Sequence, residues 1–391
     1  MNLSSHFKWL QRSIIDWNSS ATHILTNSAL HEDRRQWLNS HLPTTGSFSA
    51  HIWLATSGAT RQRPEKSKWI ALSKQALLTS AQAVNSHLEA TSQDVWLHAL
   101  PHFHVGAVGI WARAYLSGST LVDYGLQRGE RWRAERFCSM AAEFKATLSS
   151  LVPTQVYDFV QQGLRAPPSL RAIVVGGGAL PAALWRHAEL LGWCLLPSYG
   201  LSECSSQVAT ASLKANAALA SAPLVVLAHV RVQVDDQQRL MISSPSLLTT
   251  YAIEEKGLLE LCDPKCNGWL VTEDRVLLDE GGLHFQGRCG EMVKVGGECV
   301  DIGQLEQVLL ECMCEGTFTG DAALFAAEEK RLGWVVHLAC AVEGAVESEA
   351  IAQIVEAFNR RVLPFERIRA VRQIKAIPRT ALGKVIRAEI S

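Results

Sequence analysis

Three turns rich in glycine and hydroxyl residues each follow a short apolar run that is typical of a β-strand. They are TSGAT at residues 56–60, GGGALP at residues 176–181 and SYGLSE at residues 198–203. Ligands of open α/β sheets bind at the carboxyl ends of the strands. Taken singly, each turn is also typical of an ordinary tight connection. Together they predict one ligand-binding cleft.

The spacing within these turns argues against two common nucleotide sites. TSGAT lacks the second glycine and the lysine of a Walker loop, GxxxxGK[ST]. GGGALP lacks the third glycine of GxGxxG, so a dinucleotide-binding dehydrogenase is not indicated.

Other polar residues also suggest chemistry. Glu273 and Asp274 are adjacent carboxylates, a pattern that acid–base catalysis and ligand binding both use. His102 and His104 are two apart on an expected strand, but no third metal ligand is evident. The ten cysteines form no repeated CxxC pair, so we interpret them as small core residues.

The elements that must position these residues alternate between strands and helices, which predicts a parallel α/β architecture. The expected strands are 51–56, 94–101, 119–124, 146–153, 170–178 and 194–200. The expected helices are 73–88, 129–144, 154–163 and 181–192.

The pattern changes twice further along the chain. Residues 223–287 carry short strands and turns, which predicts a β-rich part of an N-terminal domain spanning 1–287. Residues 288–391 form a domain-sized α+β unit. This unit begins with a strand–turn–strand at 292–300 and a helix at 301–312 that Asp301 is suited to cap. A hairpin at 321–342 and a helix at 348–362 follow.

Composition and charge narrow the class of protein. The chain has 391 residues, 48% hydrophobic and 19% charged, with a net charge of −1. This globular composition gives no global reason to expect nucleic acid or an anionic membrane as a partner. The N-terminus lacks the apolar run of a signal peptide and no run reaches the length of a membrane span, so we expect a cytoplasmic protein without membrane insertion.

Seven motifs occur in the order found in acyl-adenylate-forming enzymes, which the chain resembles from about residue 50 to its end. They are TSGAT, LPHFHVGA (100–107), GGGALP, SYGLSE, WLVTED (269–274), GRCGEMVKVGGE (287–298) and PRTALGKVIR (378–387). Within that family, SSLVPTQ (149–155), VVGGGALP and YGLSECSSQVAT are most similar to the o-succinylbenzoate–CoA ligases of menaquinone biosynthesis. Only about fifty residues precede the first motif, so the resemblance leads us to expect a trimmed N-terminal lobe.

The resemblance implies a reaction in two halves on small-molecule substrates. A carboxylate attacks the α-phosphate of ATP to give acyl-AMP and pyrophosphate, and coenzyme A then displaces AMP. The resemblance implies that Lys384 bridges the acyl carboxylate and the α-phosphate, that Glu203 holds Mg²⁺, and that Ser202 contacts the α-phosphate. The plain alternative for Lys384 is a solvated lysine near the chain terminus.

The same resemblance assigns the nucleotide contacts. Tyr199 is expected to stack on adenine, Asp274 to bind the ribose hydroxyls, and Arg288 to reach the ribose or a phosphate. The remaining expected nucleotide-binding residues are Gly176, Gly177, Gly178, Ala179, Gly200, Thr56, Ser57, Gly58 and Thr60.

The phosphate loop departs from the family pattern. Arg61 stands where a second glycine is usual, and we hypothesise that Arg61 and Arg63 replace backbone donors with charge. Lys66 and Lys68 both remain candidates for the lysine of the family's loop.

The resemblance also implies roles outside the nucleotide site. His104, Ser206 and Gln207 are expected to line the acyl pocket. Gly290 stands at the expected hinge, where a plain turn residue is the alternative. The expected coenzyme A channel is flanked by Lys294, Gly296 and Gly297. A second contact with coenzyme A, or simply a solvated face, is suggested by Arg360, Arg361, Arg367, Arg369 and Arg372.

Three alternatives stay open at this stage. The chain could act on another aryl or medium-chain acid, load a separate carrier protein, or bind a nucleotide without turnover. The sequence leaves a homodimer open.

Overall fold

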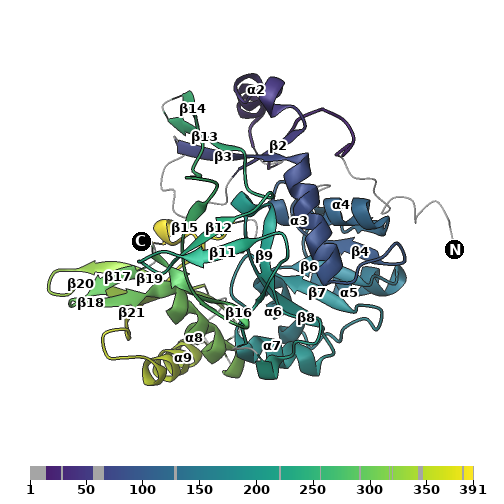
Figure 1. Ribbon diagram of the computed structural model, residues 1–391. Coiled ribbons are helices and arrows are strands. Elements are labelled where there is room, and N and C mark those ends of the chain that lie inside the picture. Colours follow the sequence, from purple (N-terminus) through teal and green to yellow (C-terminus); the bar gives the residue numbers. More distant parts are fainter. Residues whose placement is uncertain are drawn as a thin grey trace.

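A computed structural model shows the mixed α/β fold that the sequence predicts (Figure 1). The structure describes residues 15–27, 30–55, 66–126, 130–219, 222–255, 257–289, 292–316, 318, 320–341, 347–380 and 383–390.

The central element is a seven-stranded sheet in the order β10-β9-β8-β7-β6-β4-β5. Its five strands from β5 to β8 are parallel, while β9 and β10 add antiparallel strands at one edge. The strands are β4 (Val95–His98), β5 (Thr120–Asp123), β6 (Leu148–Leu151), β7 (Ala172–Val175), β8 (Leu195–Leu201), β9 (Ser206–Thr210) and β10 (Val225–Val226). Strands β6 and β7 are buried throughout, as expected for parallel strands covered on both faces.

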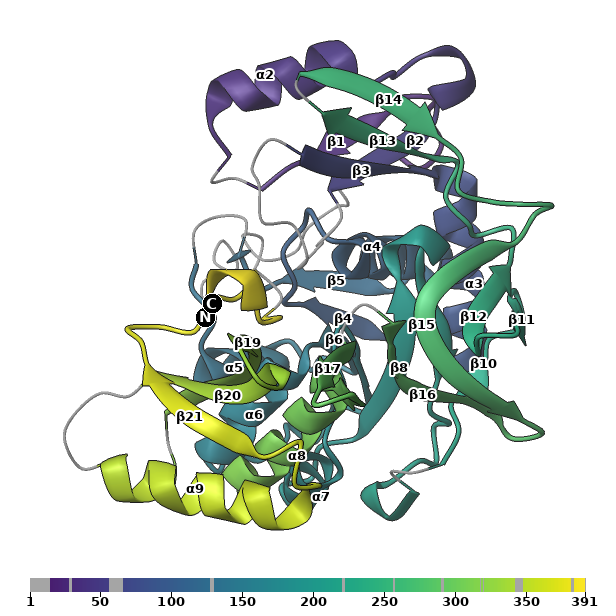
Figure 2. The same ribbon diagram turned by 90° about the vertical axis from the view of Figure 1, so that its left-hand side faces the viewer.

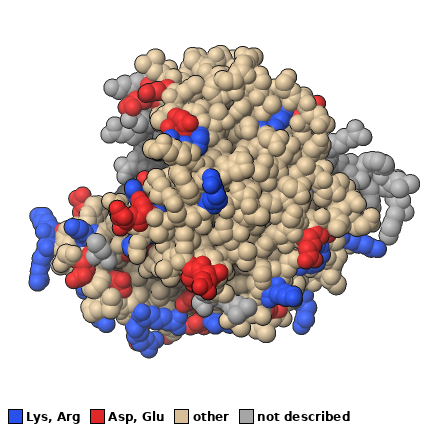
Figure 3. Space-filling view, viewed as in Figure 1, with Lys and Arg blue, Asp and Glu red and all other residues tan. Residues whose placement is uncertain are grey.

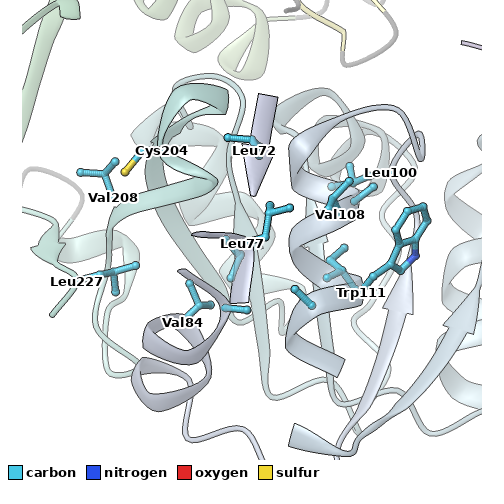
Figure 4. Close-up of a cluster of buried hydrophobic side chains, with 14 of the residues drawn as sticks. Leu72, Leu77, Val84, Leu100, Val108, Trp111, Cys204, Val208 and Leu227 are labelled. Atoms are coloured by element: carbon cyan, nitrogen blue, oxygen red, sulfur yellow. The ribbon is translucent and has the colours of Figure 1, made fainter. Parts of the chain in front are cut away.

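Helices cover both faces of this sheet. They are α3 (Lys74–His87), α4 (Val105–Ser117), α5 (Ala134–Glu143), α6 (Pro153–Gln161) and α7 (Ala182–Leu190). The alternation along β7 separates two cores: Ala172 and Val174 pack with α3 and α4, whereas Ile173 and Val175 pack with α5, α6 and α7. Figure 4 shows the first core, where side chains of α3, α4, β3 and β9 meet.

The segment before α4 corrects one expectation. His102 and His104 were expected on a strand, but residues 101–104 form a turn and His104 is the N-cap of α4. Sequence analysis assigned no helix to 105–117. Residues 107–114 of α4 are all buried, so this helix lacks the polar face by which amphipathic helices are recognised.

Two further sheets surround the central one (Figures 1 and 2). The first has the order β1-β2-β3-β13-β14, so the expected strand at 51–56 lies outside the parallel sheet. Its strands are β1 (His23–Leu25), β2 (His51–Ala55), β3 (Lys66–Ser73), β13 (Thr250–Glu255) and β14 (Leu258–Cys262). Helix α2 (Glu32–His41) lies beside this sheet, and its Leu38 packs in the same core as Trp53 of β2.

The second is an antiparallel sheet in the order β11-β12-β15-β16, in the region predicted to be β-rich. Its strands are β11 (Arg231–Val234), β12 (Arg239–Ser243), β15 (Leu270–Asp279) and β16 (Gly282–Arg288). The short 3-10 helices are η1 (Gly46–Phe48), η3 (Ser202–Cys204), η4 (Ala217–Leu219) and η6 (Arg387–Glu389).

The C-terminal residues form a sheet with a core of its own. Its strands are β17 (Met292–Val295), β18 (Glu298–Asp301), β19 (Asp321–Glu329), β20 (Gly333–Ala341) and β21 (Ile368–Gln373), and its helices are α8 (Ile302–Glu315) and α9 (Glu347–Arg361). The predicted hairpin is β19–β20, and Asp301 caps α8 by accepting a hydrogen bond from Gln304 N–H at 3.1 Å. Helix α8 contacts α7, and Cys314 of α8 packs against the central-sheet core.

The distribution of surface charge and the apolar length of the helices are the two features that relate to nucleic acid or a membrane as a partner. On the face in Figure 3, acidic and basic side chains are interspersed around a broad neutral area. Within the described ranges, no helix is both long and apolar enough to cross a bilayer.

Candidate active site

The carboxyl ends of β6, β7 and β8 converge at one edge of the central sheet. Gly177, two residues after the end of β7, has a φ of +79°, and a Cβ built there would lie 3.4 Å from Val152, which directly follows β6. A Cβ built on Gly178 would lie 3.6 Å from Pro153, and one on Gly176 would lie 3.8 Å from the carbonyl oxygen of Ser198. The predicted glycine turn therefore lies between its two neighbouring strands, and only its middle glycine needs a left-handed backbone.

Tyr199, Asp274 and Arg288 are joined in a chain of hydrogen bonds. Tyr199 O–H donates to Asp274 Oδ2 at 2.6 Å, and Arg288 Nε donates to Asp274 Oδ1 at 2.6 Å. Asp274 and Arg288 are directly paired residues of β15 and β16. Burial and the Asp274 carboxylate raise the pKa of Tyr199, which keeps the phenol protonated as a donor. The structure thus brings together three residues that lie far apart in the sequence.

The hairpin of β8 and β9 depends on Gly200. A Cβ at Gly200 would collide with the carbonyl oxygen of Ser206 on the neighbouring strand. Ser206 itself has a φ of +106°, and the strand register shifts between Tyr199 and Gly200. The predicted turn at SYGLSE is therefore mostly strand, and its glycine allows two backbones to approach each other.

Glu203 lies in η3, next to Ser202 and beyond β8. Its side chain accepts a hydrogen bond from Tyr251 O–H at 2.9 Å, and Lys68 Nζ lies 3.7 Å from the same Oε1 atom. Lys68 Nζ also lies 3.6 Å from the centre of the Tyr251 ring. Burial and the Glu203 carboxylate raise the pKa of Tyr251, so this hydroxyl also remains a donor. Sequence analysis did not identify Tyr251.

The expected acyl-pocket residues lie around the start of α4 and β9. Burial lowers the pKa of His104 to about 4, so its ring is neutral near pH 7, and its buried Nε2 has no hydrogen-bond partner. Gln207 is buried and its amide donates to Ser198 Oγ at 3.1 Å and Thr210 Oγ1 at 2.6 Å. Much of the hydrogen-bonding capacity of Gln207 is therefore used within the β8–β9 hairpin.

Arg113 of α4 is a residue that sequence analysis missed. It is 2% exposed, and no carboxylate pairs with it among the described residues. Nη1 donates to Ser150 Oγ at 3.3 Å, while Nε is buried without a partner. Burial lowers the pKa of Arg113 to about 9. A Cβ built on Gly109 would lie 3.1 Å from Arg113 Nη2 and 3.6 Å from Ser206 Cβ, which places the guanidinium near the predicted pocket. The sequence does contain a signal that could have identified Arg113, because an arginine inside the apolar run GIWARAYL is unusual.

The loop that carries Lys384 reaches the same edge of the central sheet from the C-terminal sheet. A Cβ built on Gly383, whose φ is +77°, would lie 2.6 Å from Thr154 Oγ1 at the start of α6. Arg379 holds the loop by donating to both oxygens of Asp321, at 2.9 and 2.6 Å, and to Gly383 O at 2.7 Å. The half-buried Lys384 therefore follows a residue in close contact with the strand ends that carry the glycine turn.

The remaining predicted residues either lie outside the described residues or belong to the C-terminal sheet. Thr56, Ser57, Gly58, Thr60, Arg61, Arg63 and Gly290 lie outside the described residues. Gly296 and Gly297 form the exposed turn between β17 and β18, with positive φ angles of +60° and +96°, and Lys294 is an exposed residue near the end of β17.

The family model described as AMP-binding enzyme matches residues 53–251, just over half of the chain. The chain belongs to the AMP-binding enzyme family. This confirms the family expected from the seven motifs, and the match begins in β2 and ends in β13.

Curated proteins similar to this AMP-binding enzyme are named 2-succinylbenzoate–CoA ligases. The one from Bacillus subtilis is 26% identical over 322 residues, covering 80% of this chain and 63% of that protein. The one from Salmonella typhimurium is 32% identical over 238 residues, covering 60% of this chain and 47% of that protein. The chain thus spans less than two thirds of the length of these relatives.

Solved structures show that the fold is shared. The Bacillus subtilis o-succinylbenzoate CoA synthetase in complex with its acyl-adenylate intermediate superposes with a TM-score of 0.73 at 24% identity, covering 87% of this chain and 68% of that one. The same synthetase with ATP and a magnesium ion gives a TM-score of 0.73 at 22% identity, with coverages of 94% and 78%. The predicted α/β fold of an AMP-binding enzyme is therefore confirmed.

Proposed function

We propose that this AMP-binding enzyme is an ATP-dependent acid–CoA ligase that adenylates o-succinylbenzoate and then transfers the acyl group to coenzyme A. The proposal rests above all on the contact between Gly383 and Thr154. That contact brings the loop of Lys384 to the edge where the glycine turn after β7 meets the end of β8. The names of the curated relatives support the same reaction and the same acid.

The nucleoside of ATP would occupy the edge formed by Gly176–Ala179 and Tyr199. Asp274 is already held by two donors, so its carboxylate is oriented before a ribose hydroxyl arrives. A group held in this way loses little freedom when the ligand binds. Arg288 orients Asp274 and is expected to reach the ribose or a phosphate.

Glu203 fits a magnesium ion that arrives with ATP. Mg²⁺ is usually held by one or two carboxylates together with substrate phosphates, and Glu203 offers such a hard oxygen ligand. Among the described residues, no group of three or more His, Cys, Asp or Glu side chains could hold a metal alone. When bound, the ion would neutralise charge on the phosphate oxygens, while Ser202 in the same short helix would contact the α-phosphate.

Lys384 supplies positive charge where two anions must meet. Attack of a carboxylate on the α-phosphate brings like charges together, so a nearby ammonium favours the transition state. The attacking carboxylate is already ionised and needs no general base. Arg379 and Asp321 position the lysine loop rather than contact the substrate.

Arg113 is suited to bind a second carboxylate on the acid substrate. o-Succinylbenzoate carries two carboxylates, and only one of them becomes an acyl phosphate. A buried guanidinium without an acidic partner has unused capacity to bind such a group, and desolvation strengthens the interaction. His104, Ser206 and Gln207 would form the neighbouring walls of the pocket.

Coenzyme A would enter after adenylation, when the C-terminal unit from about residue 288 turns about Gly290. Lys294 of β17 and the exposed turn of Gly296 and Gly297 would then flank the pantetheine channel. A homodimer stays open, and light scattering in solution tests it.

The test is AMP release with Mg·ATP, coenzyme A and a panel that contains o-succinylbenzoate, benzoate, anthranilate and a medium-chain acid. We expect turnover with o-succinylbenzoate above all others. Turnover with another acid alone would contradict the assigned acid, and no turnover with any acid would contradict the ligase.

A variant at Arg113 separates the acid from the reaction. We expect Arg113→Met to raise the KM for o-succinylbenzoate by about 10- to 100-fold, since a charged hydrogen-bonded contact is lost. Turnover of benzoate should change little, because it has no second carboxylate. The melting temperature should be unchanged or higher, since a buried cation without an acidic partner is replaced by an apolar side chain. Equal losses for both acids would contradict this role.

A further inference from the structure

Lys68, Tyr251 and Glu203 form a cluster that the reaction described above does not fully use. The Lys68 ammonium lies 3.7 Å from Glu203 Oε1, and Tyr251 O–H donates to that same oxygen at 2.9 Å. One oxygen of the carboxylate that would ligate a metal ion thus already accepts a hydrogen bond and lies beside a cation of the protein itself.

Strand geometry fixes the place of Lys68. Along β3, Trp69 and Ala71 face one core, whereas Ile70 and Leu72 face the core shared with the central sheet. Side chains alternate along a strand, so Lys68 projects on the same face as Ile70. Tyr251 is the direct partner of Ile70 on β13, which brings its ring diagonally next to Lys68.

The backbone of Glu203 is also fixed. Its carbonyl oxygen accepts a hydrogen bond from Leu248 N–H at 2.8 Å, just before β13. The side chains of Lys68 and Glu203 are only 26% and 19% exposed, so solvent screens their interaction less than that of a surface pair. The Tyr251 ring, 3.6 Å below the ammonium, adds a cation–π contact that favours this position.

We propose that Lys68 is a positioning residue that acts as a built-in counter-ion of Glu203, so that a divalent cation binds tightly there only together with nucleotide phosphates. The inference rests on the proposed function, because it takes Glu203 as the metal ligand. A metal ion without nucleotide must compete with the ammonium for the negative charge of the Glu203 carboxylate and is repelled by the ammonium at short range. Phosphates offer the flexible lysine a second anionic partner, so the metal and the nucleotide favour each other's binding.

The test measures Mn²⁺ binding by the loss of the free Mn²⁺ signal in electron paramagnetic resonance. The full chain is titrated with and without ATP, in the absence of acid and coenzyme A. In Lys68→Met, we expect Mn²⁺ affinity without nucleotide to rise about ten-fold, and the enhancement of Mn²⁺ affinity by ATP to fall by a similar factor. Lys68→Gln should change both in the same direction, and Lys68→Arg should retain the wild-type coupling.

Two controls locate the effect. Lys330→Met removes a charge from an exposed turn of the C-terminal sheet and should leave Mn²⁺ binding unchanged. Adding Glu203→Gln to Lys68→Met should abolish the gain in affinity. Unchanged Mn²⁺ affinity in both Lys68→Met and Lys68→Gln, or a gain that survives Glu203→Gln, would overturn the proposal.

The failure of this inference is distinguishable from failure of the ligase. If the wild-type chain releases AMP normally but the Lys68 variants bind Mn²⁺ with unchanged affinity, only the proposed role of Lys68 as a counter-ion is overturned. If the wild-type chain releases no AMP with any acid but the Lys68 variants show the expected gain in Mn²⁺ affinity, the proposed ligase function is overturned and the role of Lys68 as a counter-ion is supported.

Discussion

The two sides of the candidate site are held together in different ways. On the side of the central sheet, Tyr199, Asp274 and Arg288 come from three strands and are joined by two hydrogen bonds of 2.6 Å. On the other side, the loop of Lys384 meets α6 through van der Waals contact between Gly383 and Thr154. The hydrogen bonds that Arg379 of this loop donates, to Asp321 and to Gly383 O, lie within the C-terminal unit.

This difference predicts that the hydrogen-bonded side of the site stays assembled, whereas the loop of Lys384 docks reversibly. Charged hydrogen bonds to a buried carboxylate are costly to break, so the side that holds the nucleoside stays assembled. A van der Waals contact such as that between Gly383 and Thr154 can open at low cost, which suits a lysine that serves one half-reaction and then leaves. Three variants test whether the two sides behave in these different ways.

The largest effect is expected at the lysine. Lys384→Ala should lower the rate of acyl-AMP formation by about 10²- to 10³-fold, because charge stabilisation of the transition state is lost. Pyrophosphate release in a single turnover measures this rate. Transfer of a supplied acyl-AMP to coenzyme A should continue at nearly the wild-type rate, and an equal loss in both halves would contradict a role restricted to adenylation.

A smaller effect is expected from the contact that docks the loop. Gly383→Ala should slow acyl-AMP formation about ten-fold, because the new methyl group meets Thr154 and the φ of +77° disfavours alanine. In Gly383→Ala combined with Thr154→Ala, the steric part should be relieved and the rate partly restored. Additive losses in the double variant would show that the two residues do not meet during adenylation.

The smallest effect is expected on the assembled side. Tyr199→Phe removes one donor from the buried Asp274 and should weaken ATP binding about five-fold, through about 1 kcal/mol of lost orientation. Isothermal titration calorimetry with ATP measures this change. Acyl-AMP formation at saturating ATP should remain within about two-fold of the wild type. A larger loss there would mean that Tyr199 acts on the chemical step and not on binding alone.

Local patterns in the sequence predicted the elements whose contacts are local. The alternation of buried runs gave β4 to β8, and Asp301 before an apolar run indicated the start of α8. The glycine turn after β7 was predicted from three successive glycines after an apolar run, of which only Gly177 has a positive φ. Each of these features depends on residues within one turn or one strand.

The features that were missed depend on contacts between distant segments. Strand β2 was assigned to the parallel sheet because its sequence does not show that β3 and β13 pair beyond it. Residues 107–114 of helix α4 are all buried, so the helix gave no amphipathic signal, and the burial of Arg113 was missed with it. Likewise, Tyr251 and Lys68 meet Glu203 only because β3 and β13 are neighbours in the folded sheet.

The pairing of β3 with β13 also determines when this sheet can form during synthesis and folding of the chain. Ile70 pairs with Tyr251, so the β2–β3 hairpin has an unsatisfied edge until residues 250–255 have been synthesised. Closing such a distant pairing costs chain entropy and places this sheet among the later parts of the molecule to form. The cluster around Glu203 therefore exists only after the two ends of the family-matched region have met.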